Sequence, residues 1–272
     1  MSLFVIDESK CKQDGLCAAV CPFALITVEA GKTFPAPVDD AVERCINCGH
    51  CMAVCPVGAL TLEKMEQGTG LDPKQLPSYA QLTQLVRGRR SIRCYKKEPV
   101  DRETMARIID LARYAPTARN SQLLGWLVID NGEEIRRLAG LAVDWMWHLV
   151  AEKDPRAVSY GMEKLIRAWE NGSDPILRGA PGLVVVHAPA DYLLAQVDSA
   201  IALNTFELAA FALGVGTCWA GFFAAASRIW PPLQDALQLP PGQAIGYAMM
   251  VGYPKLKYQR LPERIAARIS WR

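Results

Sequence analysis

The chain lacks several features that would assign it to a common class of enzyme. It has only three histidines in 272 residues, no G-x-x-x-x-G-K-[ST] phosphate loop and no G-x-G-x-x-G run. The segment GVGTCWAG (214–221) falls short of the latter pattern, because Trp219 stands where its third glycine belongs. The sequence therefore excludes a P-loop nucleotidase and shows no Rossmann nicotinamide-binding domain.

Excess charge and long apolar runs are also scarce. The net charge of +2 is too small to favour nucleic acid or an anionic membrane as a partner. The first ten residues, MSLFVIDESK, have neither a signal-peptide pattern nor a twin arginine. An uncharged window at 208–226 is interrupted by three glycines, so it predicts a buried helix that ends at Gly214 and a following loop, not a membrane span. We expect a cytoplasmic protein with no nucleic-acid or membrane partner.

Cysteine, in contrast, is abundant and unevenly placed. Seven of the nine cysteines lie between Cys11 and Cys55 in short clusters, which favours metal-bound thiolates in a reducing compartment over disulfides. The run CINCGHCMAVCP (45–56) fits the iron–sulfur spacing C-x2-C-x2-C-x3-C-P at every position. CKQDGLCAAVCP (11–22) fits it with one exception, since Asp14 replaces the second cysteine. Paired zinc sites are the alternative, but they usually have two separated cysteine pairs.

The two runs are copies of one unit. Adding 34 to the residue numbers of the first run superimposes it on the second, and Asp14 then falls on Cys48. A fixed offset of this kind indicates a duplication. Over residues 1–64 the chain resembles the bacterial two-cluster ferredoxins, in which the fourth cysteine of each run ligates the other cluster. The resemblance implies one 4Fe-4S cluster on Cys21, Cys45, Cys48 and Cys51, and a second cluster on Cys11, Cys17, Cys55 and, as a candidate, Asp14.

Asp14 leaves three interpretations open. A carboxylate is a harder donor than a thiolate, so it predicts a more labile iron at that corner. The second cluster is then either a 4Fe-4S cluster with one oxygen ligand, which we favour, or a 3Fe-4S cluster with an open corner. In the third interpretation, Asp14 is a surface turn residue before Gly15.

Composition divides the chain into two domains. Residues 1–64 carry a net charge of −3 and the remaining 208 residues carry +5. Residues 65–78 contain glycines and prolines without a periodic apolar face, which predicts a linker. From residue 79 to 272, apolar periodicity predicts helices at 79–87 and after Asp101, strands at 125–130 and 182–188, a long apolar helix before Gly214, and a further strand within 242–254. This order predicts an α+β domain with helices packed on a central sheet.

Four blocks in the second domain resemble the nitroreductase family over about residues 80–264. In chain order they are RRSIRCY (89–95), APTARNSQ (115–122), LGVGTCWAG (213–221) and GYP (252–254). The resemblance implies a homodimer with FMN at the subunit interface. By the same resemblance, the flavin-contacting residues are Arg89, Arg90, Ser91, Arg93, Pro116, Thr117, Asn120, Gln122, Trp219, Ala220 and Gly221, with Arg260 and Arg264 from the basic tail.

The chemistry of these blocks is compatible with such a site. Residues 87–97 contain six cations and no acid, and guanidinium groups pair well with phosphate oxygens. A solvated basic face is the alternative for that run. Glycines near Trp219 allow the backbone to approach a flat ring. Cys94 and Cys218 are interpreted as small packed side chains. We assign no catalytic residue or proton donor, because flavin hydride chemistry does not require a histidine.

The combined sequence predicts a fused ferredoxin–nitroreductase oxidoreductase. In this hypothesis the clusters exchange single electrons with FMN, and FMN reduces a small acceptor such as a nitroaromatic or a quinone. The electron donor is an external ferredoxin-type protein or NAD(P)H. Two alternatives remain, namely a reductase of one specific metabolite and an electron carrier or redox sensor whose flavin stores electrons.

Overall fold

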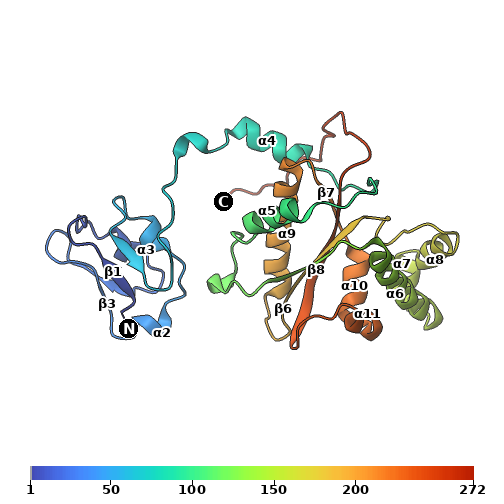
Figure 1. Cartoon of the computed structure of the whole chain (residues 1–272), viewed down its shortest axis with the longest axis horizontal. Helices are drawn as coiled ribbons and strands as arrows, with labels where there is room; N and C mark the ends of the chain where they lie inside the picture. Colours follow the sequence, from blue (N-terminus) through green and yellow to red (C-terminus); the bar gives the residue numbers. More distant parts are fainter. Residues whose placement is uncertain (1) are drawn as a thin grey trace. The chain divides into compact units, whose positions relative to one another are not determined.

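The computed structural model describes residues 2–272 and separates into two compact units (Figure 1). The first unit comprises the chain up to Leu76 together with Thr117–Ser121, and the second comprises Pro77–Pro116 and Gln122–Arg272. The division after Leu76 lies inside the segment 65–78, whose composition is typical of a linker. The sequence placed residues 79–272 in one domain and did not predict that Thr117–Ser121 would belong to the first unit.

The first unit is built from short elements. They are β1 (Phe4–Ile6), α1 (Leu16–Ala19), β2 (Ile26–Thr27), β3 (Ala36–Pro37), α2 (Ala41–Arg44), α3 (His50–Ala53), β4 (Leu60–Leu62) and the 3-10 turns η1 (Pro73–Gln75) and η2 (Ala118–Asn120). Two antiparallel ribbons form, β1 with β4 and β2 with β3. Their apolar side chains, among them Phe4, Leu25 and Leu60, are buried together with Cys17 and Cys51. The small core therefore includes two of the predicted metal ligands.

The duplication in the sequence is also a duplication of backbone shape. Gly15 and Gly49 precede α1 and α3 with φ angles of 75° and 73°. Two residues earlier, Gln13 and Asn47 have φ angles of 53° and 49°, which few non-glycine residues adopt. Equivalent positions in the two copies thus share the same unusual left-handed turns. The turns stand among the cysteines of each run, which border two small cavities.

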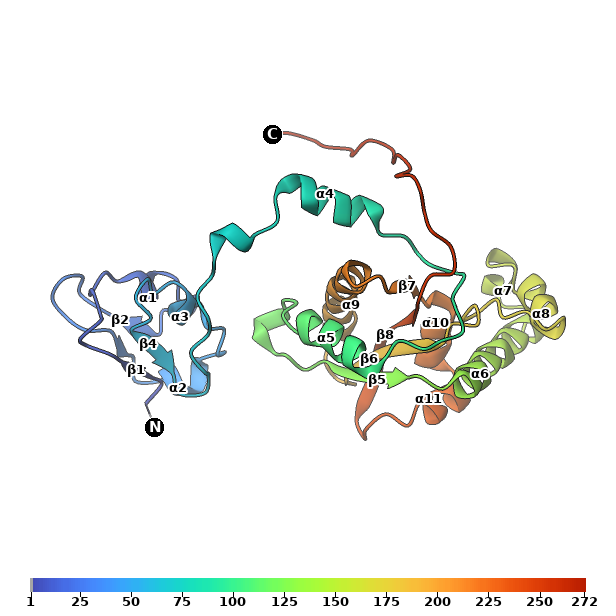
Figure 2. The ribbon, with the colours of Figure 1, turned by 45° about the horizontal axis from the view of Figure 1, so that its top comes forward.

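The second unit contains a four-stranded antiparallel sheet in the order β5-β6-β8-β7. Its elements are α4 (Tyr79–Gly88), α5 (Arg102–Ala112), β5 (Gly125–Ile129), α6 (Gly132–Ala151), α7 (Pro155–Ser159), α8 (Met162–Glu170), β6 (Gly182–Pro189), α9 (Ala195–Ala212), β7 (Gly216–Trp219), α10 (Gly221–Ile229), α11 (Pro231–Ala236) and β8 (Gln243–Gly252). Helices α5 and α9 cover one face of the sheet, and α6, α10 and α11 cover the other (Figures 1 and 2).

The side chains of β6 point alternately to the two faces of the sheet, and both faces are covered by helices. This explains why the sequence of β6 is a continuous apolar run. Val184 and Val186 join the core beneath α5 and α9. Leu183 and Val185 point to the opposite face and join the core formed with α6 and α10. Because both faces are covered, every residue from 183 to 186 is fully buried. The predicted α+β class with helices on a central sheet is confirmed.

The prediction for residues 208–226 was wrong in part. Helix α9 ends at Ala212 and Gly214 adopts a left-handed φ of 74°, close to the expected end. The expected loop, however, contains strand β7 and helix α10. Strand β7 has only four residues and pairs with β8, whose partner residues 249–252 are about 30 positions later, so no local periodicity marks it. Among residues 2–272, no helix is long and apolar enough to cross a membrane.

Candidate functional site

Two small cavities in the first unit collect the predicted cluster ligands. One is bordered by Cys21 together with Cys45, Cys48 and Cys51. The other is bordered by Cys11, Asp14, Cys17 and Cys55. Each cavity thus combines three positions of one run with the fourth cysteine of the other, the combination that the ferredoxin resemblance implies. Within residues 2–272, no three cysteine, histidine or acidic side chains converge closely enough to hold a single metal ion.

Backbone hydrogen bonds favour the thiolate form of two of these cysteines, whereas burial opposes the ionisation of Cys51 in the absence of a cationic group. Burial raises the pKa of Cys51 to about 11, and the nearby Cys48 and Cys45 add to this increase. The backbone N–H groups of Leu25 and Ala59 donate to Cys21 Sγ and Cys55 Sγ, at 3.4 and 3.2 Å. These two contacts occupy equivalent places in the two copies. The residues therefore fit iron–sulfur clusters, whose binding requires thiolates and displaces protons from such cysteines.

Asp14 borders its cavity but also makes a local contact. Its side chain is exposed, and Oδ1 accepts a hydrogen bond from the Leu16 N–H at 3.1 Å. An aspartate that bonds the backbone two residues later forms an Asx turn. The geometry is compatible with the turn interpretation and leaves the second carboxylate oxygen available to a metal.

Counting iron in Asp14 variants distinguishes these roles. We expect about eight irons per chain in anaerobically purified protein, and the same content in Asp14→Cys, because the favoured wild-type site already holds four irons. Iron analysis and EPR spectroscopy provide the measurement. Asp39→Cys, which replaces an exposed acid outside both cavities, is the control for adding a cysteine. Seven irons in the wild type, rising to eight in Asp14→Cys but not in Asp39→Cys, would instead establish the open-corner cluster.

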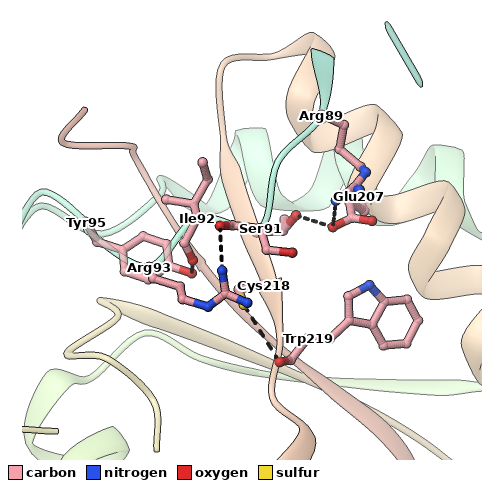
Figure 3. A network of polar contacts seen from close by, with 9 residues as sticks. Arg89, Ser91, Ile92, Arg93, Tyr95, Glu207, Cys218 and Trp219 are labelled. Atoms are coloured by element: carbon pink, nitrogen blue, oxygen red, sulfur yellow. Dashed lines mark hydrogen bonds and ion pairs between the residues drawn. The ribbon is translucent and has the colours of Figure 1, made fainter. Parts of the chain in front are cut away.

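In the second unit, the segment after α4 lies along strand β7. Ser91 forms a bridge with Thr217, and the Ile92 N–H donates to the Thr217 carbonyl at 2.8 Å. Gly216 permits this approach, since a Cβ at that position would lie 2.6 Å from Ile92 Cγ1. Two of the family-like blocks, separated by more than 100 residues, are thereby brought side by side (Figure 3).

Sequence reasoning missed a buried acid at this junction. Glu207 of α9 is 3% exposed, and its Oε1 is 2.9 Å from Arg89 Nη1. The hydroxyl of Thr217 donates to the same oxygen at 3.2 Å. The available signal was a single acid in the long apolar stretch between Leu203 and Ala212. Arg89, predicted as a flavin contact, is thus held by a neighbour that no motif indicated.

A cavity of about 870 Å³ adjoins this junction. Its cationic lining residues are Arg89, Arg90, Lys257 and Arg260, the last two from the C-terminal tail. Such a volume is typical of ligand and cofactor sites, and three guanidinium groups suit a phosphate ester. The structure therefore brings together three of the predicted cofactor residues. Arg264 lies exposed on the tail and is not among the lining residues.

The segment Trp219–Gly221 connects β7 to α10. The Trp219 ring packs edge-on against Tyr247, with centroids 5.0 Å apart. Ala220 is buried and its N–H donates to the Ala248 carbonyl at 3.0 Å. Helix α10 then begins at Gly221 without a side-chain cap, and the N–H groups of a first helical turn lack intrahelical acceptors. This geometry offers backbone donors beside Trp219.

Two neighbouring side chains complete this region. Arg93 is exposed, and its Nη1 lies 3.5 Å from the Ser91 carbonyl oxygen (Figure 3). Burial raises the pKa of Cys218, an effect that the nearby charges of Arg93 and Arg178 oppose. Cys218 is therefore a protonated, packed thiol near neutral pH, which suits the packing interpretation.

The block APTARNSQ is divided between the two units. Pro116 and Gln122 belong to the second unit, whereas Thr117 and Asn120 belong to the first. The Asn120 amide donates to the carbonyls of Ile46 and Asn47, both at 3.0 Å. Left-handed φ angles of 53°, 54° and 50° occur at Arg119, Asn120 and Gln122. Such strained turns are typical of functional loops, and the flavin contacts expected here stay predictions.

Comparison with known proteins supports the same division. Residues 86–253, more than half of the chain, match the nitroreductase family. The chain belongs to the nitroreductase family. Residues 3–56 match the 4Fe-4S dicluster domain, so this family member carries an N-terminal ferredoxin-like domain.

Relatives in the family are distant in sequence. A putative NADH dehydrogenase/NAD(P)H nitroreductase of Archaeoglobus fulgidus is 25% identical over 176 residues, covering 63% of this chain and 84% of the relative. An FMN reductase (NAD(P)H) of Bacillus subtilis is 29% identical over 180 residues, covering 64% and 67%. These findings identify a flavin-dependent oxidoreductase.

Solved structures share the fold of the second unit. A Bacteroides fragilis nitroreductase with bound FMN has a TM-score of 0.58 at 18% identity, covering 70% of this chain and 99% of that structure. A Desulfitobacterium hafniense nitroreductase with bound FMN has a TM-score of 0.54 at 24% identity, covering 69% and 97%. At these identities the likeness establishes the fold.

Proposed function

We propose that the protein is an FMN-dependent reductase in which two iron–sulfur clusters exchange electrons with the flavin. When bound, FMN supplies the conversion between single electrons and hydride transfer to a small acceptor, such as a nitroaromatic or a quinone. The observation that carries the proposal is the coexistence of two cysteine-bordered cavities and an arginine-lined cavity in one chain.

The residues of the second unit have distinct roles in this proposal. The FMN phosphate would be bound by Arg89, Arg90 and Arg260, because they line one cavity and their positive guanidinium groups pair with phosphate oxygens. Trp219 and the start of α10 would lie beside the isoalloxazine, offering an aromatic face and backbone donors. We further propose a cytoplasmic homodimer with FMN at the subunit interface, consistent with the family.

The clusters have equally defined ligands. We propose a 4Fe-4S cluster on Cys21, Cys45, Cys48 and Cys51, supported by their shared cavity. The second cavity would hold another 4Fe-4S cluster, with Asp14 as its fourth ligand. Nearby N–H donors and burial influence the potential of such clusters. The electron donor would be an external ferredoxin-type protein or NAD(P)H.

Anaerobic purification tests the proposal directly. We expect about one FMN and about eight irons per chain, measured by flavin extraction and metal analysis of the same sample. The cysteine cavities and the arginine cavity each require their own cofactor, so both should copurify. A folded, colourless protein without iron or flavin would overturn the proposal.

Rapid-mixing experiments separate the electron donors. Mixing oxidised protein with NADH, NADPH or a reduced ferredoxin shows which one bleaches the flavin absorbance. The hypothesis that NAD(P)H donates hydride directly to FMN is wrong if neither NADH nor NADPH bleaches the flavin. Steady-state turnover with nitroaromatic and quinone acceptors then tests the acceptor class. Very slow turnover with every acceptor would favour the electron-carrier alternative.

A further inference from the structure

Glu207 is a charged side chain in an environment that ordinarily excludes charge. It lies on α9, where Leu203, Phe206 and Ala210 are fully buried, and its own residue is 3% exposed. An ionised carboxylate in such a place is unfavourable unless it is paired and hydrogen-bonded. The pairing partner therefore indicates why the position is acidic.

That partner is one of the cavity-lining arginines. Glu207 Oε1 lies 2.9 Å from Arg89 Nη1, and the Arg89 side chain is 23% exposed (Figure 3). The carboxylate of the ion pair is thus buried, whereas the guanidinium is partly exposed. Arg89 also lines the 870 Å³ cavity, so the exposed part of this ion pair borders that cavity.

The guanidinium retains donors for a ligand. Arginine carries five N–H donors in a rigid planar fork. Within residues 2–272, the hydrogen bond from Arg89 to a protein side chain uses Nη1. With Nη1 held by Glu207, the fork cannot rotate freely, and its remaining N–H groups keep a defined direction.

Thr217 extends this restraint to the backbone. Its hydroxyl donates to Glu207 at 3.2 Å, and its carbonyl accepts from the Ile92 N–H at 2.8 Å. Glu207 therefore connects α9, strand β7 and the segment from Arg89 to Ile92. Three elements that carry predicted flavin contacts, or stand next to them, meet at one buried carboxylate.

We propose that Glu207 is a positioning residue that aims Arg89 at the phosphate ester of the flavin. This inference rests on the proposed FMN site. By orienting one guanidinium, Glu207 sets the preference for a flavin that carries a phosphate over one that lacks it. Glu207 itself touches no ligand in this proposal and acts through Arg89.

Simple electrostatics predicts the opposite effect. Four cationic side chains line the cavity, namely Arg89, Arg90, Lys257 and Arg260. Glu207 cancels one of these charges, so its removal alone would strengthen phosphate binding. Orientation predicts weaker binding, because an unrestrained arginine must be ordered anew by the ligand. The other three cations of the cavity stay in place either way. The sign of the change therefore distinguishes positioning from charge balance.

The test compares FMN with riboflavin, which lacks the phosphate. Flavin-free protein is titrated with each ligand, and flavin fluorescence reports the dissociation constants. We expect Glu207→Gln to weaken FMN binding by about 10- to 100-fold, the range of a hydrogen bond to a charged group, while riboflavin binding changes far less. In an Arg89→Gln background, Glu207→Gln should have no further effect on FMN affinity.

Controls keep the outcomes separate. Asp198→Asn removes another buried acid of α9, which accepts a hydrogen bond from Tyr192, and should leave the FMN preference unchanged. If Glu207→Gln does not fold, Thr217→Val removes one contact to Glu207 and should reduce the FMN preference in the same direction. Equal wild-type affinity for FMN and riboflavin would refute the proposed phosphate site. A wild-type preference for FMN that survives or increases in Glu207→Gln would refute the positioning role alone.

Discussion

Replacing Cys21 with alanine is expected to remove the cluster of the other cysteine run. The iron content should fall from about eight to about four per chain, because Cys21 shares a cavity with Cys45, Cys48 and Cys51. The surviving EPR signal should be that of the cluster proposed for the other cavity, which Cys11, Asp14, Cys17 and Cys55 border. Iron analysis and EPR on anaerobically purified protein provide the measurement.

Two further variants complete this experiment. Cys55→Ala should produce the reciprocal loss, since Cys55 borders the cavity that contains Cys11 and Cys17. Cys94→Ala, at an exposed cysteine outside both cavities, should retain all the iron. If Cys21→Ala instead eliminated the signal of the Cys11 site, the crossed arrangement of ligands would be wrong.

Replacing Phe206 with alanine is expected to cause the largest loss of stability. Phe206 is fully buried on α9 and its ring stacks on Trp126 of β5 at a centroid distance of 5.8 Å. Truncating a buried phenylalanine typically costs about 3–5 kcal/mol, since a cavity remains. In a unit of this size, that corresponds to a decrease in Tm of about 6–20 °C, measured by calorimetry.

The same variant tests whether the two units fold separately. Phe206 belongs to the second unit, so the visible absorbance and iron content of the first unit should stay at wild-type levels. Val158→Ala, at an exposed position of α7, is the matched control and should change stability by less than about 0.5 kcal/mol. Loss of iron in parallel with the lowered Tm would show that the units are coupled.

Some of the features on which these predictions rest could be inferred from the sequence alone, and others could not. The cluster ligands could be predicted from the sequence, because the spacing of a cysteine run sets the local turns that would enclose a cluster. Gln13 and Asn47 adopt the same left-handed conformation at the same distance before their helices, so the spacing of residues already implies the shape. The family resemblance also indicated Arg89 and Arg90 through the block 89–95, and Arg260 through the basic tail.

Long-range relations were not readable in this way. Strand β7 was expected to be a loop, since only its pairing with β8 gives it an extended structure. Glu207 and Arg89 are 118 positions apart, and no periodicity connects a helix interior with the end of another helix. No local sequence pattern predicted that the block 115–122 would be divided between the two units.

The sequence by itself determined the duplication, the two-domain order and the family blocks, because each depends on residues close together in the chain. It also predicted the iron–sulfur ligands. Only the tertiary structure decided which arginines line one cavity and which acid holds Arg89. Those relations depend on side chains from distant elements meeting in space, where burial makes a paired charge favourable and an unpaired one costly.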